Sequence, residues 1–263
     1  MSKLFKLSAS TLAFALMSNV TIADDAVYGK FPVTLKGYTG SKTNSVAYTG
    51  QIARHVLHDS LKALAGKGNG KPNPDLKAQM MSYFSGKDAG RSIIAPTTKG
   101  PFVVMQTNVD EISKPNLSGK TYKGTISGMP NGMTGGELIE FWIDKASSAK
   151  GGQDTANGYD YPQLISKFIM GAVFYNQAVD NYLDEKMTAD VKPNDKPYKK
   201  GAAYTGKEHS WDEGFGYFGT PGHTLKLTPR EVYEIAKRGS KSKKPEDALA
   251  MADYNKDGKV DLR

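Results

Sequence analysis

The end of the chain places oxygen-bearing side chains at the spacing of a calcium-binding loop. Residues 253–263 follow the pattern of an EF-hand or dockerin loop, with Gly258 at the position where the chain must turn sharply. Ca²⁺ is a hard cation that takes about six to eight oxygen ligands, and side chains at alternate loop positions point inward. The predicted calcium ligands are Asp253, Asn255, Asp257, Lys259 through its backbone carbonyl, and Asp261.

The pattern stops one residue before the last ligand position of an EF-hand, where a bidentate acid stands. We therefore expect the native protein to continue past Arg263, with an acidic residue next and an amphipathic helix after it. Without that acid the loop should bind Ca²⁺ weakly, with a dissociation constant of roughly 10⁻⁴–10⁻³ M, or not at all. The alternative interpretation is a solvated tail rich in Asp and Gly.

A second cluster of chemically active residues lies in the stretch 205–219. If Thr205 caps a helix, His209 and Glu213 are four residues apart and share a face, and Asp212 lies beside them. Imidazole and carboxylate groups together can hold a transition metal such as iron or zinc. The predicted second metal site therefore consists of His209, Asp212 and Glu213, and it would need partners from elsewhere, for which His55, His58 and Asp59 are candidates.

A purely structural interpretation of the same stretch competes with the metal site. Glu208 stands three residues after Thr205 and can complete a capping box, and His209–Glu213 can be an ordinary helical pair. The aromatic residues of the stretch, Trp211, Phe215 and Phe218, are more often core than part of a cofactor site.

Known enzyme signatures are missing, so catalysis is not favoured. Gly119-Lys120-Thr121 resembles the end of a phosphate-binding loop, but position 114 is lysine where that loop needs glycine. The chain has neither an H-E-x-x-H zinc motif nor a G-x-S-x-G nucleophile motif, and Ser147-x-x-Lys150 lacks its companion motifs. The chain contains no cysteine, which excludes thiol catalysis, disulfides and cysteine-based zinc sites.

The first 23 residues have the features of a secretory signal peptide. Lys3 and Lys6 precede an apolar stretch, and Thr21-Ile22-Ala23 offers small residues for cleavage, which we expect after Ala23. The apolar stretch is too short to span a bilayer, and no later segment qualifies. We expect a periplasmic or secreted protein with no transmembrane segment in its mature form.

Charge and composition fit an exported protein with a substantial core. The 35 Lys and Arg residues and 27 Asp and Glu residues give a net charge of +8, which becomes +6 without Lys3 and Lys6. The densest basic run, residues 237–244, is interpreted as a solvated linker, and nucleic acid is not an expected partner after export. Metal ions are the expected partners.

Capping signals and periodicity predict a mainly α fold. Amphipathic periodicity predicts a helix between Ser45 and Leu64, with Arg54, His58 and Lys62 nearer the polar side. The longest helix is expected from about Pro162 to Lys186, with a buried stripe that includes Asn176, Val179 and Leu183 in its second half. Capping signals predict further helix starts at Asn73, Thr134 and Thr228, the last with Gly239 as terminator, and Thr205 is a fourth start if Glu208 completes its capping box. Polar connections are expected over 114–132, 150–158 and 189–201, and a short strand over 101–106.

Four segments of the chain resemble a known family of bacterial exported proteins. They are residues 31–34 (FPVT), 46–54 (VAYTGQIAR), 171–177 (GAVFYNQ) and, above all, 208–219 (EHSWDEGFGYFG). These segments are similar to the domain-of-unknown-function family four-eight-five-six. The resemblance implies a helical fold and a function not yet characterised, and it implies that such proteins continue past a segment like 253–263 into further helices.

A more distant similarity is to imelysin-like proteins, exported helical proteins linked to iron uptake and once regarded as peptidases. Their G-x-H-x-x-E motif is matched only in part, because Gly206 stands three residues before His209 and the acid three residues after it is Asp212. The resemblance therefore carries over only His209 and Asp212.

Together these observations predict an imelysin-like helical bundle with long polar loops. The expected layout is a signal peptide over 1–23, a helical domain over 24–252 and a partial calcium loop over 253–263. The leading functional interpretation is a non-catalytic metal-binding protein. The alternatives are a metal-dependent hydrolase or peptidase that uses His209 and Glu213, and an envelope structural or interaction protein with a calcium-rigidified helix junction.

Overall fold

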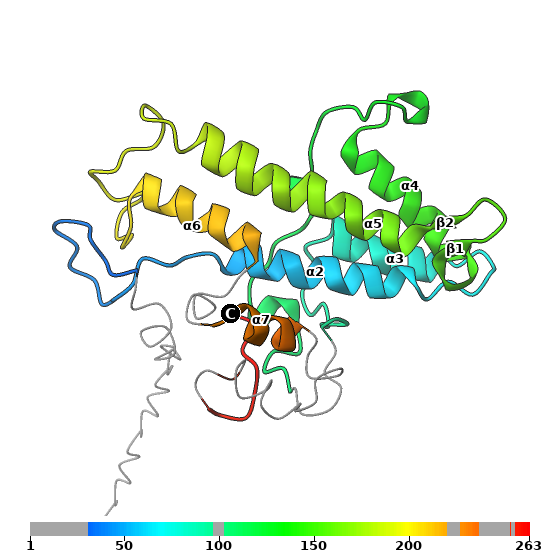
Figure 1. Ribbon diagram of the computed structural model, residues 1–263, viewed down its shortest axis with the longest axis horizontal. Helices are drawn as coiled ribbons and strands as arrows, with labels where there is room; N and C mark the ends of the chain where they lie inside the picture. The colour runs from blue at the N-terminus through cyan, green and yellow to red at the C-terminus, as the bar shows by residue number, and fades with distance from the viewer. Residues whose placement is uncertain (1–30, 97–102, 220–226, 237–252, 254–255) are drawn as a thin grey trace, which may run out of the picture.

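The protein is mainly α-helical, as expected (Figure 1). The computed structural model describes residues 31–96, 103–219, 227–236, 253 and 256–263. The helices are α2 Thr49–Ala65, α3 Pro74–Phe84, α4 Gly135–Ser148, α5 Tyr161–Ile169, η5 Met170–Glu185, α6 Gly206–Phe218 and α7 Pro229–Ala236. Short 3₁₀ turns lie at η1 Val109–Glu111, η2 Ser118–Lys120, η3 Pro130–Gly132 and η4 Lys150–Gly152, and two short strands are β1 Gln153–Asp154 and β2 Tyr159–Asp160.

Side-chain caps set where four of the helices begin, and all four predicted starts are confirmed. The Asn73 side chain accepts the Leu76 N–H at the start of α3. Each of the other three caps is reciprocal, because a threonine hydroxyl accepts the N–H of a glutamate whose carboxylate accepts the threonine N–H in return. These threonines are Thr134, Thr205 and Thr228. The expected terminator of α7, Gly239, lies outside the described residues.

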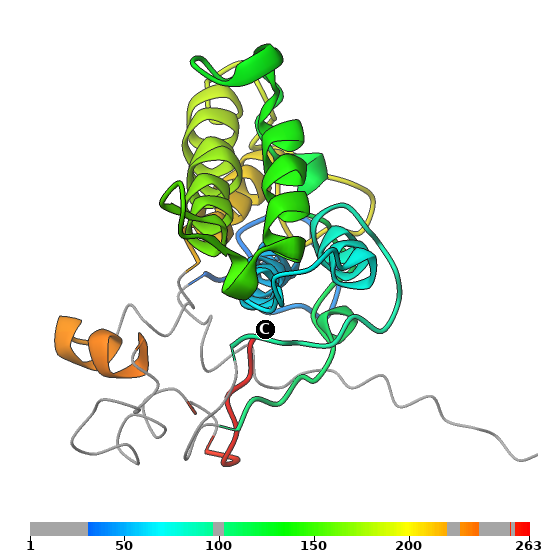
Figure 2. The ribbon, with the colours of Figure 1, turned by 90° about the vertical axis from the view of Figure 1, so that its right-hand side faces the viewer.

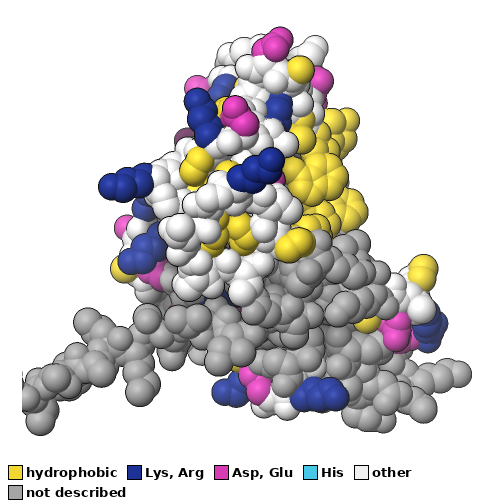
Figure 3. All heavy atoms as spheres, turned by 90° about the vertical axis from the view of Figure 1, so that its left-hand side faces the viewer, with side chains coloured by type: hydrophobic (Ala, Val, Ile, Leu, Met, Phe, Trp, Pro, Cys, Tyr) yellow, Lys and Arg dark blue, Asp and Glu magenta, His cyan; other side chains and the backbone are white. Residues whose placement is uncertain are grey.

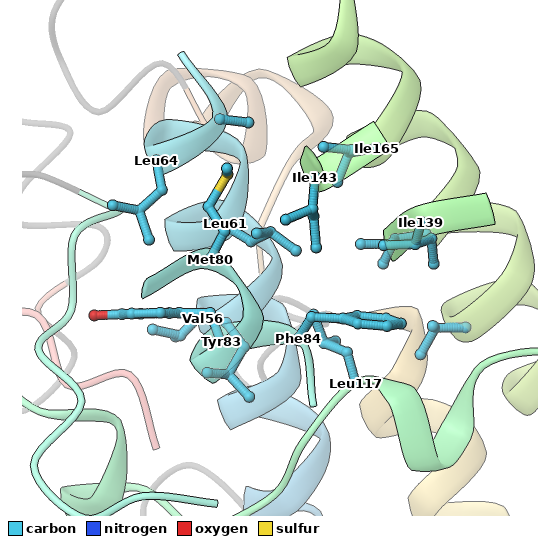
Figure 4. Packing of buried hydrophobic residues seen from close by; sticks show 14 of the residues in the cluster. Val56, Leu61, Leu64, Met80, Tyr83, Phe84, Leu117, Ile139, Ile143 and Ile165 are labelled. Carbon is cyan, nitrogen blue, oxygen red and sulfur yellow. The ribbon is translucent and has the colours of Figure 1, made fainter. Parts of the chain in front are cut away.

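Helix α2 lies at the centre of the core and contacts α3, α5 and α6 (Figure 2). Its buried face carries the apolar residues that periodicity predicts, among them Leu57, Leu61 and Leu64. These pack against Met80 and Phe84 of α3 and against isoleucines of α4 and α5 (Figure 4). One expectation for this helix is wrong: His58 is buried rather than near the polar side, because its ring meets the backbone and hydroxyl of Ser166 in α5.

The expected long helix exists, but its second half turns a different face to the core. Helices α5 and η5 follow each other without a break over 161–185, and η5 has the wider hydrogen bonding of a π-helix, as in the bond from Lys186 N to Asn181 O. This wider pitch shifts the buried positions away from a period of 3.6 residues. The residues buried in η5 are Ala172, Val173, Phe174, Gln177 and Tyr182, whereas Leu183 of the predicted stripe is exposed.

Two segments differ from what the sequence patterns predicted. Residues 150–158 were expected to be a loop, but they contain β1, which forms a small antiparallel hairpin with β2 directly after them. The strand expected over 101–106 is a single parallel bridge between Val104 and Val260, and residues 101–102 lie outside the described part. That bridge ties the end of the chain to the helical domain.

Some expectations concern parts of the chain that the structure does not cover. The predicted signal peptide, residues 1–23, lies outside the described residues, as does the basic run 237–244. Within the described ranges, none of the helices combines the length and apolar character that a membrane crossing requires.

Candidate metal and ligand sites on helix α6 and in the terminal loop

Helix α6 packs between α2 and η5, and the contact with α2 at Gly216 has no room for a larger residue. A Cβ atom added at Gly216 would lie 2.5 Å from the Tyr48 Cβ and 2.9 Å from the Gln51 Cβ, at the start of α2. A Cβ at Gly214 would lie 3.4 Å from the Tyr182 Cβ of η5. Gly216 therefore sets how closely α6 approaches α2, whereas a Cβ at Gly214 would make an ordinary contact with η5.

The C-terminal end of α6 is closed by a third glycine and a histidine. Gly219 adopts a left-handed conformation, with φ of +80°, and ends the helix. The His55 Nε2 atom lies 3.2 Å from the Gly216 carbonyl oxygen and 3.1 Å from that of Tyr217. Burial lowers the pKa of His55, so the neutral ring donates to these carbonyl groups near the helix end. His55, a candidate partner of the predicted metal site, is thus engaged in packing.

His209 packs against two tyrosine rings, which also contact each other. Its ring centroid is 4.3 Å from that of Tyr198 and 5.0 Å from that of Tyr204, with the second pair close to parallel. Burial lowers the pKa of His209, although the nearby Glu213 carboxylate opposes this change. The His209 Nε2 is 3.7 Å from Glu213 Oε2, and Nδ1 is buried with no hydrogen-bond partner in the described part of the chain.

Glu213 connects α6 to both neighbouring helices. Its Oε1 accepts a hydrogen bond of 3.0 Å from Gln51 Nε2 of α2, and it also hydrogen-bonds the Tyr182 hydroxyl of η5. Lys120 and Lys186 both approach the Tyr182 side chain, Lys120 by a hydrogen bond of 3.3 Å to its hydroxyl and Lys186 over its ring at 4.0 Å. Burial is the main cause that lowers the pKa of each lysine, and the Glu213 charge partly offsets it.

Asp212 points to different surroundings from His209 and Glu213. Its Oδ2 accepts a hydrogen bond of 2.6 Å from the Ala47 N–H, and the residue is only 8% exposed. Burial raises the pKa of Asp212 to about 7, even though the Ala47 N–H favours the charged form. The predicted trio is therefore divided: His209 and Glu213 come together, and Asp212 binds the segment that leads into α2.

No group of three or more His, Cys, Asp or Glu side chains is close enough to hold a metal among the described residues. His58 is hydrogen-bonded to Asp59 and Ser166, so it does not join His209.

The sequence also did not point to Gln51, Lys120 and Tyr182 as neighbours of Glu213. These residues lie at least 31 positions from Glu213 along the chain, and no local pattern links residues at such separation. The transition-metal site stays a prediction.

The terminal loop folds around the carboxylate of Asp253. Its Oδ1 accepts the Asp257 N–H at 3.2 Å, and its Oδ2 accepts the Gly258 N–H at 2.7 Å. Gly258 has a φ of +83°, the left-handed conformation that the predicted sharp turn requires, and Lys256 has a φ of +59°. Asn255, a predicted calcium ligand, lies outside the described residues.

The other end of the loop is attached to the helical domain. The Asp261 carboxylate accepts hydrogen bonds from Gln106 Nε2 at 2.6 Å and from Arg263. Burial opposes ionisation, but these hydrogen bonds prevail and lower the pKa of Asp261. Val260 pairs with Val104, and Leu262 packs against the main hydrophobic cluster. The loop is therefore attached to the folded domain over 260–262, whereas residues 256–259 are exposed.

The fold and these sites define a mainly α-helical protein with an acidic, glycine-rich helix held between two others. Residues 148–233 match the model of a family described as Domain of unknown function (DUF4856). The matched part contains α6 with all three of its predicted metal ligands, and it leaves α2 and the terminal loop outside. No curated protein matches the chain, and no solved structure does. The match supports the family resemblance of the 208–219 motif, whereas the likeness to imelysin stays a prediction.

We expect Gly216→Ala to destabilise the protein by about 1–3 kcal/mol, because the added methyl group overlaps Tyr48 and pushes α6 away from α2. Urea unfolding measures this change. The matched control is Gly171→Ala in η5, where a Cβ has nothing within 4 Å. That helical substitution should be neutral or stabilising by up to about 1 kcal/mol. Equal effects of the two substitutions would contradict the close-packing explanation.

We expect Asp212→Asn to change the pH dependence of stability. The folded-state pKa of about 7 lies above the ordinary 3.8, so the folded state binds more protons between these values and loses stability as pH rises through that window. The amide still accepts the Ala47 N–H but does not titrate. The variant should therefore gain stability relative to wild type from pH 4 to pH 7, by roughly 4 kcal/mol at most. Urea unfolding across this range measures the difference, and Asp144→Asn, an exposed carboxylate, is the control. Parallel profiles for Asp212→Asn and wild type would show that Asp212 titrates normally.

Proposed function

We propose that this protein is a non-catalytic calcium-binding protein in which Ca²⁺ stabilises the junction between the terminal loop and the helical domain. The observation that carries the proposal is the wrapping of the loop backbone around the Asp253 carboxylate, with two N–H groups directed at it and Gly258 in the required turn. A hard cation binds to carboxylate oxygen atoms such as those of Asp253. The donor set of the loop consists of carboxylate, amide and backbone oxygen atoms, which fits Ca²⁺ better than a soft metal.

The attachment of the loop favours a structural role for the ion. Val260 bonds to the 103–105 segment through two backbone hydrogen bonds, from Met105 N at 2.9 Å and to Val103 O at 2.7 Å. The Leu262 N–H donates to Gln106 Oε1 at 2.9 Å. A cation bound at Asp253 and Asp257 would fix the start of the loop, in addition to the hydrogen bonds that fix its end. Binding to the folded state alone would then stabilise the whole domain.

Two further parts of the sequence-based interpretation belong to the same proposal. His209 and Glu213 are offered as a weaker site for iron or zinc, supported by the unpaired Nδ1 of a neutral imidazole next to a carboxylate. A hydrolytic role for this pair has less support, because the described residues offer it no third metal ligand.

Export by the N-terminal segment, with cleavage after Ala23, is the second part of the proposal. N-terminal sequencing of the protein recovered from the periplasm or medium of an expressing bacterium tests it, and an intact Met1 would contradict it.

We expect calorimetric titration of the purified chain with CaCl₂ to give a dissociation constant of about 10⁻⁴–10⁻³ M. At a free Ca²⁺ concentration ten times that constant, stability should rise by about 1.4 kcal/mol. Asp253→Asn combined with Asp257→Asn should abolish both effects, because the amides keep the loop hydrogen bonds but remove the charge. Asp144→Asn removes a carboxylate far from the loop in sequence and serves as the control.

The calcium proposal fails if no binding heat appears up to about 10 mM CaCl₂, or if the double variant binds as the wild type does. Titrations with Zn²⁺ and Fe²⁺ run separately and are compared with His209→Ala. Loss of a transition-metal response in that variant, with the calcium response unchanged, would separate the two sites.

A further inference from the structure

A cavity of about 240 Å³ lies between helix α6 and the segment that leads into α2, and no calcium ligand contributes to it. Four aromatic side chains form its walls, from both sides of the cavity: Phe31, Tyr48, Trp211 and Phe215. The Phe215 ring centroid lies 6.4 Å from that of Phe31 and 5.9 Å from that of Tyr48. Figure 3 faces the end of the molecule that carries this segment and the start of α6, and it shows hydrophobic side chains gathered on one side.

Two carboxylates line this apolar cavity from the same face of α6. Glu208 and Asp212 are four residues apart, so they stand one turn above each other. Neither forms an ion pair within the described ranges, and no lysine or arginine of those ranges lines the cavity. Lys42 and Glu213 are the charged groups that act on Asp212 from a distance, with opposite effects. The cavity therefore carries negative charge without a nearby counter-ion.

The two carboxylates differ in how many of their oxygen atoms accept hydrogen bonds. Glu208 is engaged at both ends, by the Thr34 hydroxyl at 2.6 Å and by the Thr205 N–H at 2.7 Å. Asp212 uses Oδ2 for the Ala47 N–H, and its Oδ1 has no hydrogen-bond partner among the described residues. Asp212 as a residue is only 8% exposed, but this oxygen stays open to solvent. A donor that enters the cavity can therefore reach it.

We propose that this cavity binds a small organic ammonium ion, with the ammonium N–H groups on Asp212 Oδ1 and the carbon skeleton between the aromatic rings. A positive charge next to Glu208 and Asp212 satisfies the unbalanced carboxylates, and aromatic faces attract cations. The volume is below the roughly 300–1,000 Å³ of pockets that hold drug-sized ligands, so the ligand must be small.

Other ligand classes fit the cavity less well. An anion would meet two carboxylates and no cationic side chain. A metal ion would find one free carboxylate oxygen and aromatic walls, and the described residues provide no group of three metal ligands. A neutral apolar molecule would exclude water from Asp212 Oδ1 without offering it a hydrogen-bond donor. A protonated amine on an apolar group supplies both the donor and the apolar surface.

The test uses the full chain and benzylammonium at pH 8, where Asp212 is ionised. Calorimetry should show saturable binding, and a Trp142→Phe background should report it by a change in Trp211 fluorescence, because these are the two tryptophans of the chain. Benzyl alcohol, which has the same size without the charge, should bind at least about tenfold more weakly, the equivalent of 1.4 kcal/mol.

Two variants locate the site. Asp212→Asn keeps the shape and should weaken benzylammonium binding about tenfold or more. Trp211→Leu, at a half-exposed position that the core does not need, should weaken it without loss of fold as judged by circular dichroism. Asp144→Asn should bind as the wild type does. The proposal is overturned by absence of binding up to about 10 mM, by equal binding of benzyl alcohol, by unchanged affinity in Asp212→Asn, or by saturation of this site with Ca²⁺ or Zn²⁺ instead.

Discussion

The close approach of helix α6 to α2 and η5 is the constraint on which the rest of the structure depends. Gly216 allows α6 to lie against Tyr48 and Gln51, and at Gly214 the helix meets Tyr182 at an ordinary contact distance. Only at this separation can Glu213 bond to Gln51 and Tyr182, and only then can Asp212 reach the Ala47 N–H. The charged side chains of α6 are buried at acceptable free energy because these partners are in reach.

The three acids of α6 have three different physical roles because a helix directs successive side chains to different sides. Glu208 closes the first turn and holds Thr34. Asp212 lies in an apolar cavity, where burial raises its pKa. Glu213 interacts with the charges of Lys120 and Lys186 and hydrogen-bonds Tyr182. Within six residues the same chemical group is thus a cap, a carboxylate without a nearby counter-ion and a member of a polar network.

Two regions of the described chain contain the carboxylates to which the proposed ligands would bind. In the terminal loop, backbone N–H groups fold around Asp253, and the loop is fastened to the domain by Val260 and Leu262. In the α6 cavity, aromatic rings surround Asp212. The proposed ligands differ because their surroundings differ: the oxygen-bearing side chains in the loop sequence suit a hard metal ion, and aromatic walls suit an organic cation.

The sequence by itself determined the features that depend on neighbouring residues. The caps at Asn73, Thr134, Thr205 and Thr228, the amphipathic α2 and the turn at Gly258 all follow from contacts within about five positions, so local pattern was sufficient. Only the tertiary structure decided which face of η5 is buried, because its π-type pitch departs from the 3.6-residue period. It also decided that Asp212 faces away from His209 and Glu213, and that Val260 pairs with Val104. Those outcomes depend on residues brought together from distant parts of the chain, and no spacing within one segment encodes such a contact.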